Sequence, residues 1–221
     1  MLYVVSTPIG NLKDITLRAV DILSKADFIA CEDTRHTNKL LAHYNIKKPL
    51  ISYHSYNKQK SSEEILKKLK AGSCIALVTD SGTPGVNDPG WLIIKKVIDA
   101  GLPLEAIPGV SAFLAALSIS GMPTDKFFFA GFLSSKSGRR RGQIENLAKV
   151  EATIIIYEAP HRIIKLLKDL LDCLGDADIV LARELTKKFE EVRREKISTS
   201  LRHFSEVRPR GEFVVIFRPS N

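Results

Sequence analysis

The sequence has few of the residues that build disulfide frameworks or metal sites. Its three cysteines, Cys31, Cys74 and Cys173, are far apart, and no CxxC pair occurs. The five histidines are scattered as well. An odd number of cysteines without framework spacing predicts buried free thiols in a reducing compartment, and the scattered histidines predict no metal site.

Long apolar runs are also missing. The apolar stretch Met1–Val5 soon meets Pro8 and lacks a basic leader. No run of about 18 apolar residues, the length of a membrane span, occurs. The sequence therefore predicts neither a signal peptide nor contact with a membrane, and we expect a cytoplasmic protein.

What is present is enough apolar sequence for a core and an excess of positive charge. The chain has 221 residues, of which 44% are hydrophobic, a length that permits one large or two small domains. The formal net charge is +8. A basic balance favours an anionic partner, and nucleic acid is the usual one.

The most informative stretch is Thr79–Gly90, TDSGTPGVNDPG, which follows an apolar run that reads as a buried strand. Three Gly and two Pro cannot continue a strand or fill a helix interior. The stretch suits a loop at the carboxyl end of a parallel strand, where α/β sheets bind ligands. We expect glycine N–H groups and the Asp80 carboxylate to meet a polar ligand there, although a turn without a ligand is the alternative.

Ten short strands alternate with helical segments along the chain, five before and five after residue 122. This alternation predicts an α/β fold with two tandem domains, each a mixed, mostly parallel sheet flanked by helices. The polar, Gly- and Pro-containing stretch SGMPTDK places the boundary near residue 120. We therefore expect an N-terminal domain over residues 1–120 and a C-terminal domain over residues 121–221, with a cleft between them.

Six motifs occur in an order that points to a known family. They begin at Thr7 (TPIGNL), Cys31 (CEDTR), Thr79 (TDSGTPGVNDPG), Ile107 (IPGVSA), Tyr157 (YEAPHR) and Ala182 (ARELTKKFEE). Together they resemble the RNA-modifying branch of the tetrapyrrole methylase (class III) family, over essentially the whole chain. The first loop, TPIGNL, departs from the GxGxGD of tetrapyrrole-acting members, which favours the RNA branch. Many members of that branch continue into a further C-terminal region, whereas this sequence ends soon after the last predicted strand.

The resemblance implies an S-adenosylmethionine-dependent methyltransferase that methylates the ribose 2′-hydroxyl of a cytidine in 16S ribosomal RNA. It also implies a homodimer whose partner is 16S rRNA or the small ribosomal subunit, with S-adenosylmethionine in the cleft. The implied cofactor contacts are Pro8, Gly10, Asp80, Gly82, Thr83, Pro84, Ser111, Ala112, Tyr157 and Leu185.

Methyl transfer to a ribose hydroxyl needs positioning, and a nearby base or cation helps a nucleophile of high pKa. Polar residues at predicted strand ends supply the candidates. The predicted catalytic set is Glu158, His161, Arg162, Arg35 and Glu184, with Asp33 and Lys187 beside them. Each has a plainer interpretation: a helix-start carboxylate, a half-buried histidine, a solvated charge cluster around Arg35, or a surface pair of Glu184 with Lys187.

The segment KSGRRR reads as a basic loop entering a helix, and its cations suit RNA phosphates. The predicted RNA contacts are Lys136, Arg139, Arg140 and Arg141, with a solvated, mobile loop as the alternative. Two other functions stay open: a small-molecule methylase of the tetrapyrrole type, and a non-catalytic RNA-binding protein that keeps the fold.

Overall fold

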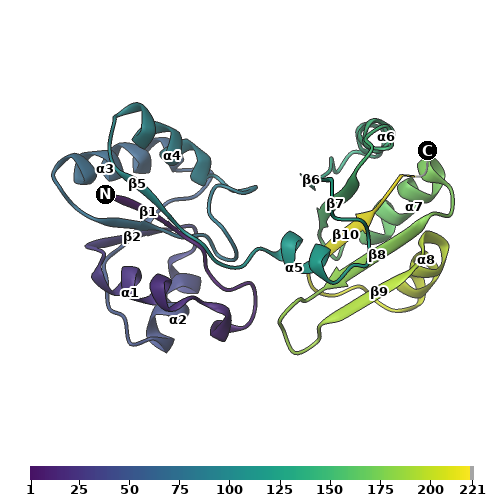
Figure 1. Cartoon of the computed structure of the whole chain (residues 1–221), viewed down its shortest axis with the longest axis horizontal. Helices are drawn as coiled ribbons and strands as arrows, with labels where there is room; N and C mark the ends of the chain where they lie inside the picture. The colour runs from purple at the N-terminus through teal and green to yellow at the C-terminus, as the bar shows by residue number, and fades with distance from the viewer. Residues whose placement is uncertain (220–221) are drawn as a thin grey trace. The chain divides into compact units, whose positions relative to one another are not determined.

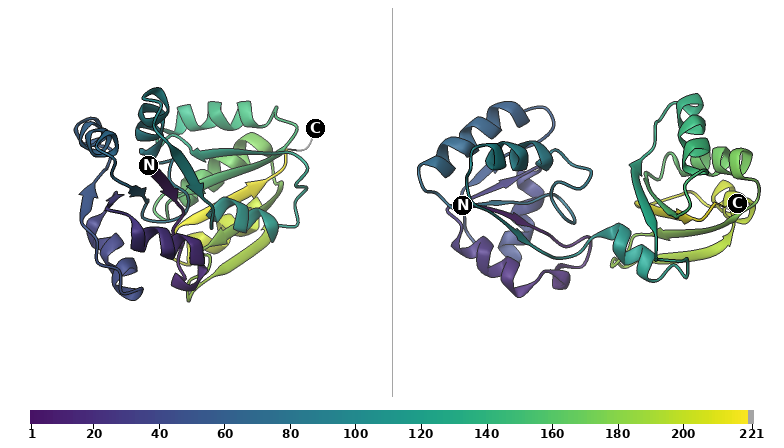
Figure 2. Two further views of the ribbon diagram at one scale, coloured as in Figure 1. Left: turned by 60° about the vertical axis from the view of Figure 1, so that its left-hand side comes forward. Right: turned by 45° about the horizontal axis from the view of Figure 1, so that its top comes forward.

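The computed structural model describes residues 1–219, and the chain divides into two compact units, Met1–Ser111 and Ala112–Asn221. Each unit contains one five-stranded sheet (Figures 1 and 2). The predicted domain boundary at residue 120 lies later, because helix α5 (Ala112–Ser118) contacts β7 and β10 of the second unit.

The first unit is built on a parallel sheet with the strand order β3-β2-β4-β1-β5. Its strands are short apolar runs bounded by turn residues: β1 (Leu2–Val5), β2 (Phe28–Cys31), β3 (Leu50–Ser52), β4 (Ile75–Leu77) and β5 (Leu104–Ile107). All four strand pairings are parallel. The carboxyl ends of the strands therefore meet at one edge of the sheet, and the loops that follow them gather there.

Helices cover both faces of this sheet (Figure 1). After the short η1 turn (Leu12–Asp14), α1 (Leu17–Lys25) and α2 (Thr34–His43) bury apolar residues on one face, and α3 (Lys58–Lys70) and α4 (Gly90–Asp99) do so on the other. Thr16 caps α1 by accepting from the N–H of Ala19, and Asp33 caps α2 by accepting from Arg35 and His36. The direction of the crossovers reverses after β3, which is why the two helix pairs lie on opposite faces.

The second unit has a mixed sheet with the order β6-β7-β10-β8-β9. Its strands are β6 (Phe127–Phe132), β7 (Thr153–Glu158), β8 (Asp178–Arg183), β9 (Glu191–Lys196) and β10 (Phe213–Phe217). Only β6 and β7 pair in parallel, whereas the other three pairings are antiparallel. The fold class is confirmed, but the expectation of a mostly parallel sheet is wrong for this unit. A short hairpin joins β8 to β9, and such a connection permits only antiparallel pairing.

Three helices cover one face of this second sheet: α6 (Ser137–Leu147), α7 (Ile163–Leu174) and α8 (Ile197–Glu206). On the other face, Phe113 of α5 stacks on Phe129, with ring centroids 4.5 Å apart. Arg194 of the edge strand β9 donates to the backbone carbonyls of Ile119 and Ser120 just after α5. These contacts fix α5 to the second unit.

The longest helix in the part of the chain described is α3, with 13 residues. A membrane span needs about 20 apolar residues. Within residues 1–219 no helix is long and apolar enough to cross a bilayer.

Candidate functional site

The loops after β1 and β4 lie next to one another at the carboxyl edge of the first sheet, and they are joined by backbone hydrogen bonds. Thr7 N donates to the carbonyl of Gly82 at 2.9 Å, and Gly82 N donates back to Thr7 at 3.0 Å. The hydroxyl of Thr7 also donates to the carbonyl of Thr79. Gly82 has φ +85°, a left-handed conformation that favours glycine. This bridge sets the shape of the TDSGTPG loop.

The loop after β5 is tied to the same edge through Thr83. The hydroxyls of Ser6 and Thr83 lie 2.9 Å apart, and Thr83 also donates to the carbonyl of Val110 at 3.3 Å. A Cβ on Gly109 would lie 2.8 Å from the Cβ of Ser6, so only glycine permits this approach. Three loops that are distant in sequence thus form one rigid surface.

Carboxylates from two loops complete this edge. The N–H of Asp33 donates to Asp80 Oδ1 at 3.1 Å, and the Thr79 hydroxyl donates to Glu32 at 2.9 Å. Burial raises the pKa of Glu32, and the neighbouring carboxylates of Asp88 and Asp80 add to the rise, against the hydrogen bond from Thr79. The hydrogen bonds from the N–H groups of Arg35 and His36 lower the pKa of Asp33. The edge therefore carries negative charge and is suited to accept hydrogen bonds from hydroxyl or amino groups.

The glycine N–H groups of the central loop are used within the protein. Gly82 donates to Thr7, while Gly85 and Gly90 both donate to the Asp88 carboxylate. The expectation that these N–H groups meet a ligand is therefore wrong for all three glycines. The Asp88 carboxylate therefore fixes the backbone of the loop. The groups of the loop that are left to contact a ligand are the Asp80 carboxylate and the Thr83 hydroxyl.

The predicted cofactor contacts fall into two groups. Eight of them lie in the loops just described or where they end: Pro8, Gly82 and Pro84 are buried, Gly10 is exposed, and Asp80, Thr83, Ser111 and Ala112 are half-buried. The other two come from β7 and from the segment after β8: the Tyr157 hydroxyl accepts from the N–H of Phe113 at 3.1 Å, and Leu185 is buried. Ser6, Thr79 and Glu32 also belong to this edge but are not among the predicted contacts. Thr79 and Glu32 lie inside the motifs TDSGTPGVNDPG and CEDTR, and Ser6 directly precedes TPIGNL.

The buried Glu158 and the half-buried Arg162 form an ion pair where β7 ends. The Arg162 Nε lies 3.0 Å from Glu158 Oε1, which also accepts from the N–H of Ala159, and the Glu158 side chain is 0% exposed. Oε2 of Glu158 has no hydrogen-bond partner among the described residues. Burial raises the pKa of Glu158, against the N–H of Ala159 and the charge of Arg162. A carboxylate buried in this way orients Arg162, whereas His161 beside it is exposed.

The remaining catalytic candidates are not part of this cluster. Arg35 is exposed in the first turn of α2, in the first unit. Glu184 is half-buried in the β8–β9 hairpin with φ +50°, and it accepts from Lys187 at 2.9 Å and from the N–H of Glu212. The predicted pair of Glu184 with Lys187 is therefore present.

Gly211 makes room for Glu184, and this contact gives a testable prediction. A Cβ on Gly211 would lie 2.2 Å from Glu184 Cγ, and its φ is +77°. We expect Gly211→Ala to lower the free energy of unfolding by about 1–3 kcal/mol, because it adds a clash to a strained backbone. Gly121→Ala is the matched control, since Gly121 has φ +78° with no atom within 4 Å. Equal losses of stability in urea unfolding of the two variants would contradict the clash.

The predicted RNA-binding segment differs from the expectation. Helix α6 begins at Ser137, so the three arginines lie on a helix and not on a loop. Arg140 is 2% exposed and pairs with Asp169 at 2.6 Å, so its assignment as a phosphate contact is wrong. Arg141 is paired with Asp169 and Asp172, which leaves Lys136 and Arg139 exposed and outside any ion pair within residues 1–219.

In the described part of the chain, no group of three or more His, Cys, Asp and Glu side chains is arranged to hold a metal ion. The three cysteines are free thiols, of which Cys31 is buried and the other two are half-buried. Burial raises the pKa of the Cys31 thiol, which makes it a poor nucleophile.

Comparison with known proteins places this geometry in context. A model of the family described as Tetrapyrrole (Corrin/Porphyrin) Methylases matches residues 1–200. A protein of Synechocystis sp. named "Ribosomal RNA small subunit methyltransferase I" is 48% identical over 98% of this chain and 78% of its own length. Proteins with the same name from Bacillus subtilis and Thermotoga maritima are 46% and 42% identical, over 100% and 97% of this chain and 76% and 96% of their own lengths.

Solved structures share the fold at low sequence identity. Diphthine synthase matches with a TM-score of 0.78 and 16% identity, over 98% of this chain and 89% of its own. Uroporphyrin-III C-methyl transferase from Thermus thermophilus, complexed with S-adenosylhomocysteine, matches with a TM-score of 0.69 and 20% identity, over 98% and 96%. At such identities the likeness shows the architecture alone.

Proposed function

Because this chain belongs to the family of tetrapyrrole (corrin/porphyrin) methylases, we propose that it is an S-adenosylmethionine-dependent methyltransferase acting on small-subunit ribosomal RNA. The observation that supports this most strongly is a sequence identity of 48% and 46%, over 98% and 100% of this chain, to two relatives named ribosomal RNA small subunit methyltransferase I. S-adenosylmethionine is the methyl donor. The product we propose is a cytidine methylated at its ribose 2′-oxygen, made by a cytoplasmic homodimer.

The carboxyl edge of the first sheet is the part of the proposed cofactor site that can be argued from contacts. The cross-linked loops are fixed before any ligand arrives, so little ordering cost falls on binding. Asp80 and Thr83 offer acceptors to the hydroxyl and amino groups that S-adenosylmethionine carries. Pro8, Gly10, Pro84, Ser111 and Ala112 shape the surface around them, and Tyr157 and Leu185 stay predictions from the family resemblance.

Methyl transfer from a sulfonium is an in-line displacement, and most of its catalysis is positioning. The attacking hydroxyl must lose its proton, and a cation beside the oxygen favours that loss. We propose Arg162 and His161 as the groups that contact the ribose or its phosphate, because both reach solvent from the end of β7. Glu158 acts as a positioning residue for Arg162, while Arg35 and Glu184 stay proposals with a weaker geometric basis.

The function is tested with purified protein, S-adenosylmethionine carrying a labelled methyl group, and small ribosomal subunits that lack the modification. We expect label in the 16S rRNA and, after digestion to nucleosides, in 2′-O-methylcytidine. Label on a uroporphyrinogen in place of RNA would support the small-molecule methylase instead. RNA binding that is indifferent to S-adenosylmethionine, with no transfer, would support the non-catalytic alternative. Light scattering of the same sample tests the homodimer.

Glu158→Gln tests the positioning role. We expect kcat to fall about tenfold, because Arg162 loses its ionic partner and the reacting groups lose alignment. Affinity for S-adenosylmethionine stays within twofold, since no contact at the first sheet's edge changes. Glu145→Gln, an exposed carboxylate on α6, is the control. A wild-type kcat for Glu158→Gln would remove the residue from the mechanism.

A further inference from the structure

The segment between β3 and α3 presents an aromatic side chain to solvent. Tyr56 is 99% exposed, although a tyrosine ring is normally at least partly covered. The segment follows β3, so it lies at the same carboxyl edge of the sheet as the proposed cofactor loops. No other part of the proposed function uses it.

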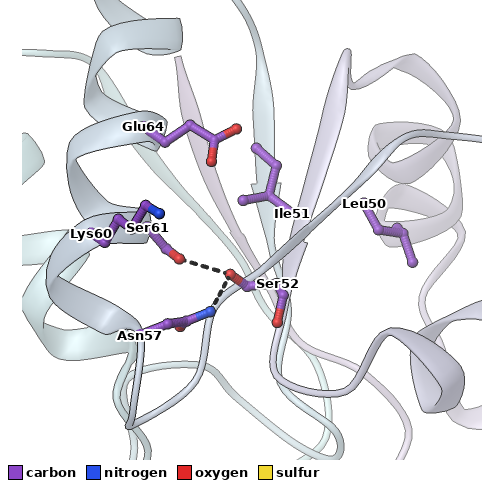
Figure 3. Close-up of a pocket in the computed structure, with 7 residues that line it drawn as sticks. All are labelled: Leu50, Ile51, Ser52, Asn57, Lys60, Ser61 and Glu64. Carbon is purple, nitrogen blue, oxygen red and sulfur yellow. Dashed lines mark hydrogen bonds between the residues drawn. The ribbon is translucent and has the colours of Figure 1, made fainter.

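Side-chain hydrogen bonds hold the backbone on either side of Tyr56 in place. The side chains of Asn57 and Ser61 both donate to the carbonyl of Ser52, at 3.0 and 2.9 Å (Figure 3). Asn57 Oδ1 accepts from the N–H of His54, and His54 Nδ1 accepts from the N–H of Tyr56. A loop fixed in this way presents its ring at little entropic cost on binding.

Positive charge and a recess accompany the ring. Helix α3 carries five lysines and two glutamates, and its first turn contributes Lys58 and Lys60. Neither of these two lysines forms an ion pair with any described residue, in contrast to Arg140 and Arg141 on α6. A pocket of about 370 Å³ opens at Lys60, with Asn57 and Glu64 also among its lining residues (Figure 3).

We propose that the β3–α3 segment is a binding site for single-stranded RNA, in which Tyr56 stacks on an unpaired base and Lys58 and Lys60 contact phosphates. Stacking on an exposed aromatic ring together with flanking cations is the usual chemistry of single-strand recognition. The pocket, which Asn57, Lys60 and Glu64 help to line, gives a neighbouring nucleotide of the same strand a recess. This inference rests on the proposed function, because it names the surface by which that enzyme holds its substrate.

The test compares full-length wild type with Tyr56→Ala, Tyr56→Phe and Lys60→Ala. Binding is measured by fluorescence anisotropy with a labelled single-stranded RNA oligonucleotide and with unmodified small ribosomal subunits. Calorimetry with S-adenosylmethionine on the same samples shows whether each variant is folded and binds the methyl donor. Lys95→Ala is the matched control for Lys60→Ala, because Lys95 is an exposed lysine of the same unit that pairs with Asp99.

We expect Tyr56→Ala to weaken binding of both RNA probes about 5- to 100-fold, while Tyr56→Phe retains the wild-type affinity. Lys60→Ala lowers the slope of log affinity against log salt by about 0.7, and Lys95→Ala leaves it unchanged. In Tyr56→Ala and Lys60→Ala we expect the KM for RNA to rise while kcat stays unchanged.

Wild-type RNA affinity of Tyr56→Ala, with methylation intact, would overturn this inference and leave the proposed function standing. Loss of subunit binding without loss of oligonucleotide binding would overturn it too, because the contact would then be with a ribosomal protein. A wild type that binds S-adenosylmethionine but methylates no RNA would overturn the proposed function, and this inference with it.

Discussion

Gly82→Asp is expected to reduce the affinity for S-adenosylmethionine roughly 100-fold or more. Gly82 lies in the left-handed region at φ +85°, where a residue with a Cβ is strained by about 1–2 kcal/mol. A Cβ there would lie 3.7 Å from Ile9 and 3.8 Å from the carbonyl of Val110. The aspartate adds a carboxylate beside that carbonyl oxygen in a buried position, which is costly without a partner. The bridge to Thr7 and the shape of the loop are then lost together.

The matched control for this variant is Gly72→Asp. Gly72 has φ +92° and is exposed after α3, with no atom within 4 Å of a built Cβ. It carries the same type of backbone strain away from the proposed site. Calorimetric titration of both variants separates the loop's role from general loss of stability. Equal affinity in Gly82→Asp and wild type would exclude this loop from the cofactor site.

The sequence predicted an α/β fold with two sheets because short strand-like runs alternate with helical segments along the chain. Five strands in each half follow from that pattern, and the structure confirms them. The sequence does not predict that most strands of the second sheet pair antiparallel. The last strand of the chain, β10, lies between β7 and β8, and no local pattern indicates that position.

The candidate site was predicted as a set of loops but not as a network. That TDSGTPG ends a buried strand is visible in the sequence, whereas the bridge from Thr7 to Gly82 is not. Glycine content indicated bare N–H groups, but the partners that use them come from residues distant in sequence or from Asp88. Likewise three consecutive arginines look equivalent in a sequence, and only the position of α7 shows that Arg140 is buried.

Asp169→Asn is expected to lower the free energy of unfolding by about 3 kcal/mol at neutral pH. The carboxylate is buried and accepts from Ser137, Arg140 and Arg141, and its replacement leaves the Arg140 guanidinium buried without an ionic partner. Breaking such a pair from one side is strongly destabilising. We expect the double variant with Arg140→Met and Asp169→Leu to recover most of the loss, since it removes both charges and keeps apolar volume. Urea unfolding of wild type, Arg140→Met, Asp169→Leu and this double variant forms the cycle that measures the pair.

The pH dependence of this loss has a definite sign. Burial alone would raise the pKa of Asp169, but the hydrogen bonds from Arg141 and Arg140 outweigh it and hold the pKa below its ordinary value of 3.8. The stability that the pair contributes is therefore complete above pH 3.8 and is lost as the pH falls through the lower, folded-state pKa.

The difference in the free energy of unfolding between wild type and Asp169→Asn should then become smaller at acid pH. For Glu158 the pH dependence of stability has the opposite sign, because its pKa in the folded protein is raised above 4.5. The wild type therefore loses stability as the pH rises from 4.5 through that raised pKa, and Glu158→Gln, which cannot ionise, does not. Parallel pH profiles for the two variants would contradict the assignment of Arg140 and Asp169 to structure. With Arg140 and Arg141 held in ion pairs, the cations left to meet RNA on this segment are Lys136 and Arg139.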